Sequence, residues 1–197
     1  VGWNTSSSGT TGPLGANVSQ TFSSNATYYA ITSKQITATF DKSGASSIGA
    51  TTQSCYAYNG STAGCSITTP TITAASGFTV VGWNTSASAT SSQVDVSKST
   101  TIKTNTTYYA ITKKTITVTF EKNGASSIGA TSQSCVIYNY SGAATSCNIT
   151  SPTITAASGF TVIGWNTSTS AVKGWAAGEQ KEFTNNATYY AITKKTI

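Results

Sequence analysis

The sequence predicts an all-β or β-rich α+β chain built from small modules in tandem. Three observations predict this class. A segment of about 80 residues recurs along the chain, and a fixed period is typical of proteins assembled from like modules. Apolar and polar residues alternate in several short segments, which is the pattern of half-buried strands. No stretch longer than about ten residues has a helical period.

Two short motifs mark the repeat. Gly-Trp-Asn-Thr-Ser recurs around Trp3, Trp83 and Trp165, and Tyr-Tyr-Ala-Ile-Thr begins at Tyr28, Tyr108 and Tyr189. These markers divide the chain into the C-terminal part of a truncated repeat, two complete repeats and the start of a next one. The boundaries that we expect are 1–33, 34–114, 115–195 and 196–197. This pattern predicts that the 197 residues are an excerpt of a longer repetitive protein.

Strands are expected at equivalent places in each repeat. Residues 36–40 and 116–120 alternate apolar and polar side chains, and each segment is followed by a Lys-Ser-Gly or Lys-Asn-Gly turn. Residues 78–83 and 160–165 form a second expected strand, and 107–111 a third. Their Thr, Val, Ile, Tyr and Phe residues are those that sheets favour.

Other segments predict turns, core positions and loops. Residues 74–77 are compatible with a single helical turn ended by Gly77, which is why an α+β class stays open. One apolar residue lies six positions before each Tyr-Tyr pair and predicts a core position: Phe22, Ile102 and Phe183. The stretches that follow the marker tryptophans differ most between repeats and predict exposed loops, at 9–15, 87–92 and 171–178.

Each complete repeat contains one pair of cysteines, Cys55 with Cys65 and Cys135 with Cys147, separated by 10 and 12 residues. The chain has no histidine and few acids, so zinc-site patterns fail, and the spacing is not that of a redox pair. One disulfide per repeat is the simplest interpretation, and two free buried thiols are the alternative. Disulfides indicate an oxidising, extracellular setting. The Asn, Gly and Ser residues between the cysteines predict a hairpin tip.

The marker aromatic residues predict a packed interior. We expect core or module-junction positions for Trp3, Trp83, Trp165, Tyr28, Tyr108 and Tyr189, because each recurs next to a predicted strand. Sugar-stacking platforms are the alternative for the tryptophans. Trp175 occurs in the variable stretch of one repeat only, so it is the candidate for a surface contact.

Composition argues against several function classes. The net charge is +6 from eleven lysines, with no arginine, and the lysines are dispersed, which disfavours a nucleic-acid partner. No apolar run reaches the ~18 residues that would predict a membrane span in this segment. Of the five acids, only Asp41 and Glu121 are repeat-equivalent, so no paired carboxylate site is predicted. We therefore expect no enzyme activity, no cofactor and no metal.

The repeat motifs resemble a known family. Gly77-Phe78-Thr79-Val80-Val81-Gly82-Trp83, Asn105-Thr106-Thr107-Tyr108-Tyr109-Ala110 and the strand that begins at Thr117 are similar to the Listeria–Bacteroides repeat, also called the internalin B-repeat-like module. The resemblance implies tandem β-grasp-like modules in a beads-on-a-string array. It also implies a bacterial surface or secreted protein, often an adhesin, and it carries no catalytic residues. The cysteine pair is an addition to the family pattern.

The function that we expect is structural. The chain is predicted to be a repeat segment of an extracellular stalk, fibre or adhesin on a bacterial cell surface. The alternative is an adhesive module that binds a glycan or protein through its variable loops. The expected partners are neighbouring copies of the same repeat, in a homopolymer or in a lateral filament joined through exposed edge strands. A cell-surface glycan or protein is the partner that the alternative requires.

Overall fold

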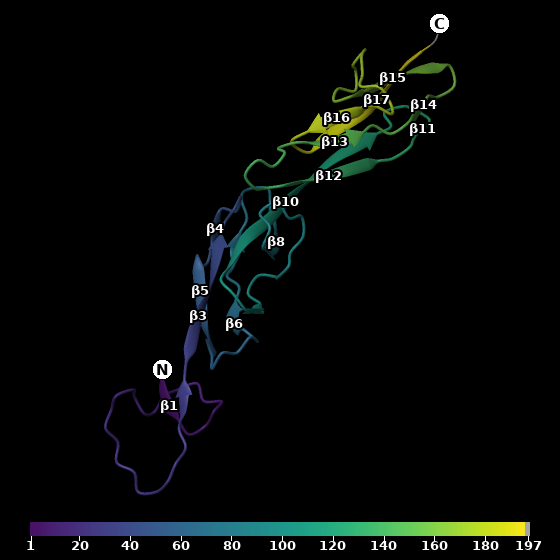
Figure 1. Cartoon of the computed structure of the whole chain (residues 1–197). Coiled ribbons are helices and arrows are strands. Elements are labelled where there is room, and N and C mark those ends of the chain that lie inside the picture. Colours follow the sequence, from purple (N-terminus) through teal and green to yellow (C-terminus); the bar gives the residue numbers. More distant parts are fainter. Residues whose placement is uncertain (196–197) are drawn as a thin grey trace. The chain divides into compact units, whose positions relative to one another are not determined.

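The structure is a computed structural model that describes residues 1–195, so the expected start of a further repeat at 196–197 lies outside the described residues. The described residues form strands and no helix, and the chain is therefore all-β (Figure 1). None of its described elements is a helix that could cross a membrane. The strands in chain order are β1 (Gly2–Asn4), β2 (Tyr29–Ile31), β3 (Ser33–Asp41), β4 (Ser47–Ile48), β5 (Thr52–Tyr58), β6 (Cys65–Thr68), β7 (Ile72–Thr73), β8 (Thr79–Asn84), β9 (Ser99–Ile102), β10 (Thr106–Glu121), β11 (Ser127–Ile128), β12 (Ser132–Tyr138), β13 (Cys147–Thr150), β14 (Ile154–Thr155), β15 (Phe160–Asn166), β16 (Gln180–Phe183) and β17 (Ala187–Lys195).

The chain divides into two compact units. Unit 1 contains Val1–Ser76 and Val80–Ile111, and unit 2 contains Gly77–Thr79 and the chain from Thr112 onward. Strand β10 contributes 106–111 to unit 1 and 112–121 to unit 2. The three residues at 77–79 therefore belong to unit 2, although they lie inside the first complete repeat of the sequence.

In unit 1, β3 is the central strand. It pairs in antiparallel fashion with β5 and in parallel with the beginning of β10, and β8 also pairs with β10. The alternation in β3 has a direct physical result, since Ile36, Ala38 and Phe40 are buried while Thr39 is exposed. The complete repeat also contains two short two-stranded sheets, β4 with β7 and β6 with β9. In the truncated repeat, β1 pairs with β2.

Unit 2 repeats this arrangement. Strand β10 pairs in antiparallel fashion with β12 and in parallel with β17, and β15 pairs in antiparallel fashion with β17. The two-stranded sheets are β11 with β14 and β13 with β16. In each complete repeat, the first strand and the last strand are thus parallel neighbours.

Each unit closes its own hydrophobic core from equivalent positions. Residues from the larger sheet and from the two-stranded sheets, β6–β9 in unit 1 and β13–β16 in unit 2, both contribute. The core therefore lies between these sheets. The equivalent buried pairs are Ile36 and Ile116, Phe40 and Phe120, Ile67 and Ile149, Trp83 and Trp165, Ile102 and Phe183, and Tyr108 and Tyr189.

Two local predictions were wrong. Residues 76–77 form a reverse turn instead of a helical turn, because Gly77 has a φ of +79° and cannot continue a right-handed helix. The cysteines do not bracket a hairpin. Cys55 is in β5, which pairs with β3, whereas Cys65 is in β6, which pairs with β9. The backbone hydrogen bonds of both strands are thus satisfied by strands remote in sequence.

The core position expected for Phe22 is also not observed. Phe22 is 54% exposed, whereas the equivalent Ile102 and Phe183 are 3% and 6% exposed. Ile102 pairs with Cys65 of β6, and Phe183 pairs with Cys147 of β13. Residues 1–33 contain no described strand equivalent to β6 or β13, so the Phe22 ring lacks the strand that covers Ile102 and Phe183.

Candidate functional site: the disulfide-linked module core

One disulfide connects two sheets in each complete repeat. Cys55 bonds Cys65 with Cα atoms 5.8 Å apart, and Cys135 bonds Cys147 with Cα atoms 6.0 Å apart. No free cysteine is found among the described residues. Each bond joins a strand of the larger sheet, β5 or β12, to a strand of a two-stranded sheet, β6 or β13. All four cysteines pack against a core. The disulfides therefore hold together the two layers that enclose each core.

The loop between the cysteines has different lengths in the two units, yet the flanking strands are equivalent. The buried and exposed positions follow the same order in β5 and β12, and again in β6 and β13. The two added residues leave the registers unchanged, because β5 and β12 pair with β3 and β10, and β6 and β13 pair with β9 and β16.

The marker tryptophans Trp83 and Trp165 are fully buried at the centre of the cores. The Trp83 ring meets Phe40 edge-to-face at 4.9 Å, and its Nε1 donates to the Pro70 carbonyl oxygen at 2.9 Å. Trp165 repeats both contacts, with Phe120 at 4.8 Å and with the Pro152 carbonyl oxygen at 2.9 Å. The indole N–H is thus satisfied inside an apolar interior, which makes these positions difficult to replace.

The tyrosines of the second motif pack beside the same phenylalanines. Tyr108 stacks on Phe40 at 5.7 Å, and Tyr189 lies 6.5 Å from Phe120. In the truncated repeat the equivalent residues are less covered: Trp3 is 41% exposed, and Tyr28 is half-buried with its ring 5.5 Å from Phe22. Residues 1–33 contain no equivalent of Phe40, and this explains the difference.

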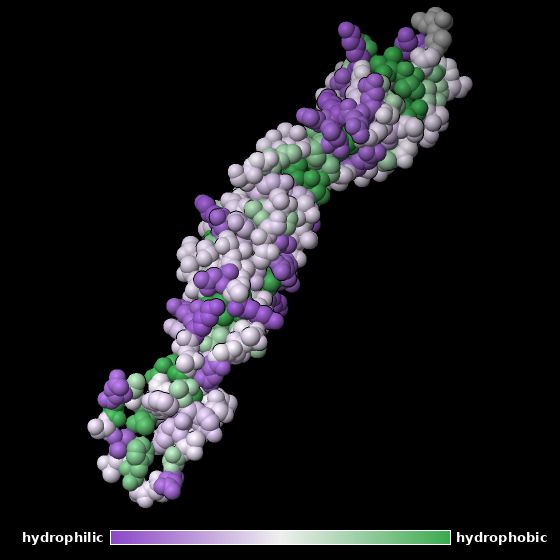
Figure 2. All heavy atoms as spheres, viewed as in Figure 1, coloured by the Kyte–Doolittle hydropathy of each residue, from purple (hydrophilic) through white to green (hydrophobic). Residues whose placement is uncertain are grey.

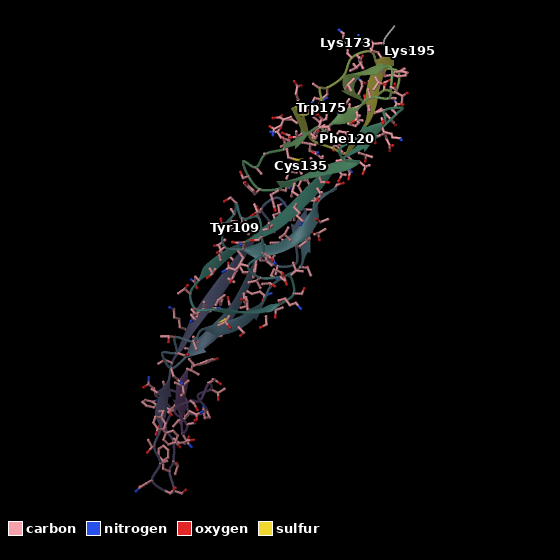
Figure 3. All side chains as sticks on the ribbon, turned by 90° about the vertical axis from the view of Figure 1, so that its right-hand side faces the viewer. Tyr109, Phe120, Cys135, Lys173, Trp175 and Lys195 are labelled. Carbon is pink, nitrogen blue, oxygen red and sulfur yellow. A yellow bond between two sulfur atoms is a disulfide. The ribbon has the colours of Figure 1, made fainter. Side chains whose placement is uncertain are left out.

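Trp175 does not lie in an exposed loop as the sequence suggested. Its ring lies 5.7 Å from Phe183 and 5.4 Å from Tyr189, against the core of unit 2 (Figure 3). The reason is a backbone bridge, in which Trp175 N donates to Trp165 O at 2.7 Å and Trp165 N donates to Trp175 O at 2.8 Å. A role of Trp175 in surface contact would have to use the part of the ring that the core leaves uncovered.

The bridge between Trp165 and Trp175 has a counterpart in each of the other two repeats. Leu14 bridges Trp3, and Val94 bridges Trp83, in the same way that Trp175 bridges Trp165. A large apolar residue therefore recurs 10 or 11 positions after each marker tryptophan. The recurrence is difficult to recognise from the sequence, because the residues around it differ between the repeats.

Two buried hydroxyl groups were also missed. Thr69 Oγ1 donates to the Asp95 carbonyl oxygen at 2.6 Å, and Ser151 Oγ donates to the Ala176 carbonyl oxygen at 2.6 Å. Both residues are buried directly before the proline whose carbonyl accepts from the tryptophan. They attach the variable loop of each unit to its core. The recurrence of Thr-Pro-Thr-Ile-Thr and Ser-Pro-Thr-Ile-Thr in the two repeats was the available signal.

Each unit has a cleft beside its cysteine loop. In unit 1 the cleft has a volume of about 490 Å³, and Lys34, Ile36 and Ala57 are among its lining residues. In unit 2 the equivalent cleft has a volume of about 350 Å³ and is lined by Lys114, Ile137 and Phe78, among others. No group of three or more metal-binding side chains is found in the part of the chain that the structure describes. The arrangement can thus support packing and docking contacts.

A comparison with family models matches the Listeria-Bacteroides repeat domain to residues 37–111 and again to 117–192. The chain belongs to this family. The matches cover most of the chain and confirm the resemblance and the tandem organisation inferred from its motifs. Comparisons with curated proteins and with solved structures returned no match.

Family membership has general consequences. Listeria-Bacteroides repeats are typical of bacterial surface proteins and are a repeat domain without catalytic function. The two disulfides agree with an extracellular setting, because such bonds persist in oxidising compartments. The surface also fits a module exposed to water: hydrophilic side chains, in purple, are scattered among residues of intermediate hydropathy (Figure 2).

The glycine of the Gly-Trp motif is expected to contribute to the stability of each Listeria-Bacteroides repeat. Gly164 has a φ of +134°, and a Cβ atom there would lie 2.5 Å from the Trp175 carbonyl oxygen. We expect Gly164→Ala to destabilise unit 2 by about 1–3 kcal/mol, because both the backbone conformation and the Trp165–Trp175 bridge are affected. Denaturant unfolding followed by tryptophan fluorescence measures this change.

The matched control is Gly142→Ala. Gly142 has a φ of +80°, but no atom lies within 4 Å of a Cβ built there. It therefore reports the cost of an alanine at a positive φ without a close contact. Equal effects of the two substitutions would show that the close approach to Trp175 contributes nothing.

Proposed function

We propose that this chain is a structural repeat segment of an extracellular stalk, fibre or adhesin on a bacterial cell surface. The observation that carries the proposal is that both units enclose the same aromatic core and each is closed by its own disulfide. Repeats that each bury their own core can be added in series, and the length of the protein then grows with the number of copies.

The proposal includes the nature of the modules. We take 34–114 and 115–195 as the repeating modules and 1–33 as the C-terminal part of another. We describe them as β-grasp-like, since the first and last strands of each are parallel neighbours in its sheet. No enzyme activity is assigned, because the recurring buried residues are aromatic and aliphatic and the recurring polar ones hold loops.

Immunogold electron microscopy of intact source cells tests the proposal. Antibodies raised against this chain should label thin projections outside the cell envelope, and purified native protein should form fibres with one bead per repeat. Labelling confined to the cytoplasm, or compact particles without a repeat, would contradict it. Antibodies against a cytoplasmic protein of the same cells give the control for access.

An adhesive function is the second candidate. The loop of unit 2 favours it, since Val172 is 85% exposed and Lys173 is exposed next to it. In this case a cell-surface glycan or protein would be bound through the variable loops. Exchange of residues 171–174 for the loop at 87–92 of unit 1 should then abolish adhesion of source cells and leave fibre length unchanged. Adhesion that persists after the exchange would favour the purely structural function.

A further inference from the structure

A cross-strand pair on the outer face of the larger sheet differs between the two units. In unit 1, Gln35 of β3 lies opposite Tyr56 of β5, and in unit 2 the equivalent pair is Thr115 of β10 and Val136 of β12. The core residues of these strands lie on the other face, because side chains alternate between faces along a strand. The outer face of unit 1 therefore has an aromatic ring beside an amide group, where unit 2 has two β-branched side chains.

Tyr56 is accessible to a ligand. It is 50% exposed, and its ring centroid lies 6.4 Å from that of Tyr58, two positions along the same strand. The equivalent Val136 is 41% exposed, so exposure is a property of this position in both units. A tyrosine held in this way presents a flat apolar ring together with a hydroxyl group.

The neighbours of Tyr56 on this face are polar and uncharged. The residues opposite it, diagonal to it and two positions along β5 are Ser33, Gln35, Thr37, Ser54 and Tyr58. Gln35 is exposed, and its amide group both donates and accepts hydrogen bonds. The hydroxyl oxygens of Thr37 and Ser54 lie 2.8 Å apart and retain capacity for further hydrogen bonds. These neighbours offer an ionic ligand no partner of opposite charge, and the surface is therefore complementary to an uncharged one.

We propose that this surface of unit 1, defined by Gln35, Thr37, Ser54 and Tyr56, binds an uncharged polysaccharide built from equatorially substituted pyranose rings. Such a ring has an apolar C–H face that can stack on the exposed tyrosine, and its hydroxyl groups can exchange hydrogen bonds with the amide and hydroxyl groups beside it. A protein partner is disfavoured, because a stable protein interface needs a larger apolar centre than this surface provides.

This inference goes beyond the proposed structural function, and the two can fail independently. A stalk can be assembled from its repeats whether or not a sheet face binds sugar. The adhesive candidate described above uses the variable loops, which are a different surface. One ring and a few polar groups bury little area, so we expect an oligosaccharide to bind with a dissociation constant of about 1 mM.

The test is a titration of the full 197-residue chain with cellohexaose and, separately, with N-acetylchitohexaose, followed by ¹H–¹⁵N and aromatic ¹H–¹³C NMR. We expect saturable shifts of the Tyr56 ring and of the Gln35 side-chain amide with at least one of these neutral oligosaccharides. Tyr56→Val should weaken the binding by about tenfold or more, the loss expected for an anchor residue. Valine already occupies the equivalent position in unit 2, so this variant should fold like the parent chain.

The variable loop provides the control for the position of the site. Val172→Ala changes an 85% exposed residue in the loop of unit 2 and should leave the titration unchanged. The double substitution Gln35→Thr with Tyr56→Val gives unit 1 the pair that unit 2 has, and it should abolish the shifts. Together, these variants separate binding at the sheet face from binding at the loop.

The reciprocal change tests whether the pair is sufficient. Unit 2 already has the hydroxyl pair, since the oxygens of Thr117 and Ser134 lie 2.8 Å apart. Thr115→Gln with Val136→Tyr completes the same surface there. This chain should bind two oligosaccharides where the parent chain binds one, with new shifts of the amides of β10 and β12.

Four outcomes would overturn the proposal. One is an absence of saturable shifts with both oligosaccharides up to about 10 mM. Another is binding that Tyr56→Val leaves intact or that Val172→Ala abolishes, because the site would then lie elsewhere. The third is the absence of a second site in the Thr115→Gln, Val136→Tyr chain. The last is binding of anionic polygalacturonate in preference to both neutral oligosaccharides that weakens steeply with salt, because the dispersed lysines would then be responsible.

Discussion

Trp165→Ala is expected to destabilise unit 2 by about 3–5 kcal/mol, enough to unfold much of a module of this size. The substitution removes a fully buried indole ring that meets Phe120 edge-to-face, and it leaves the Pro152 carbonyl oxygen without its donor. Both the cavity and the unpaired carbonyl raise the free energy of the folded state. Hydrogen exchange read by mass spectrometry should show lost protection in β12 and β17.

The chain contains its own control for this experiment. Trp3 occupies the same position in the repeat motif but is 41% exposed, so Trp3→Ala should cost less than about 1 kcal/mol. Strands β3 and β5 of unit 1 serve as an internal reference in the same exchange experiment. Similar losses from Trp3→Ala and Trp165→Ala would show that burial does not determine the contribution of the motif.

Removal of the Cys135–Cys147 disulfide is expected to destabilise unit 2 by about 2–5 kcal/mol. The bond closes a loop with a sequence separation of 12 and joins strands that belong to different sheets, so its loss frees the unfolded chain and loosens the two layers around the core. The double substitution Cys135→Ser and Cys147→Ser avoids a free thiol. Thermal unfolding of this variant, compared with the reduced and oxidised parent chain, measures the effect.

The equivalent bond in unit 1 provides the matched comparison. Cys55→Ser with Cys65→Ser removes the bond that closes a loop with a sequence separation of 10. The chain-entropy model predicts almost the same stabilisation for this bond. Each double variant should lower the stability of its own unit. An unfolding temperature that is the same in the parent and in both variants would exclude a structural role for the disulfides.

The small size of each module explains why a disulfide adds usefully to the stability that its aromatic core provides. A module of about 80 residues buries a smaller fraction of its surface than a larger domain, and its margin of stability is correspondingly small. Loops attached through Thr69 and Ser151, and layers joined by the cysteines, add local constraints to a modest core.

Much of the local structure could be predicted from the sequence. Alternation at 36–40 and 116–120 places three side chains of each segment in a core, and these segments lie in β3 and β10. The recurrence of motifs at about 80 residues predicted tandem units, and the family match confirmed them. The cysteines were identified as a pair within each complete repeat, which is the connectivity that the structure has.

The packing of the partly buried Trp175 against the core and the exposure of Phe22 could not be predicted in this way. Trp175 is held by a backbone bridge to Trp165 within a loop whose residues change from repeat to repeat. Phe22 matches Ile102 and Phe183 in spacing, yet burial needs a strand from the cysteine segment, which lies far away along the chain. Burial depends on the partners of a residue, and spacing alone does not identify them.

The sequence by itself determined the strand-forming segments, the repeat length and the family, because alternation is a local pattern and the motifs recur in register from copy to copy. Only the tertiary structure decided which strands pair and that each disulfide joins two sheets instead of closing a hairpin. The physical reason is that these outcomes depend on hydrogen bonds between strands that do not follow one another in the sequence, such as the pairing of Cys65 in β6 with Ile102 in β9.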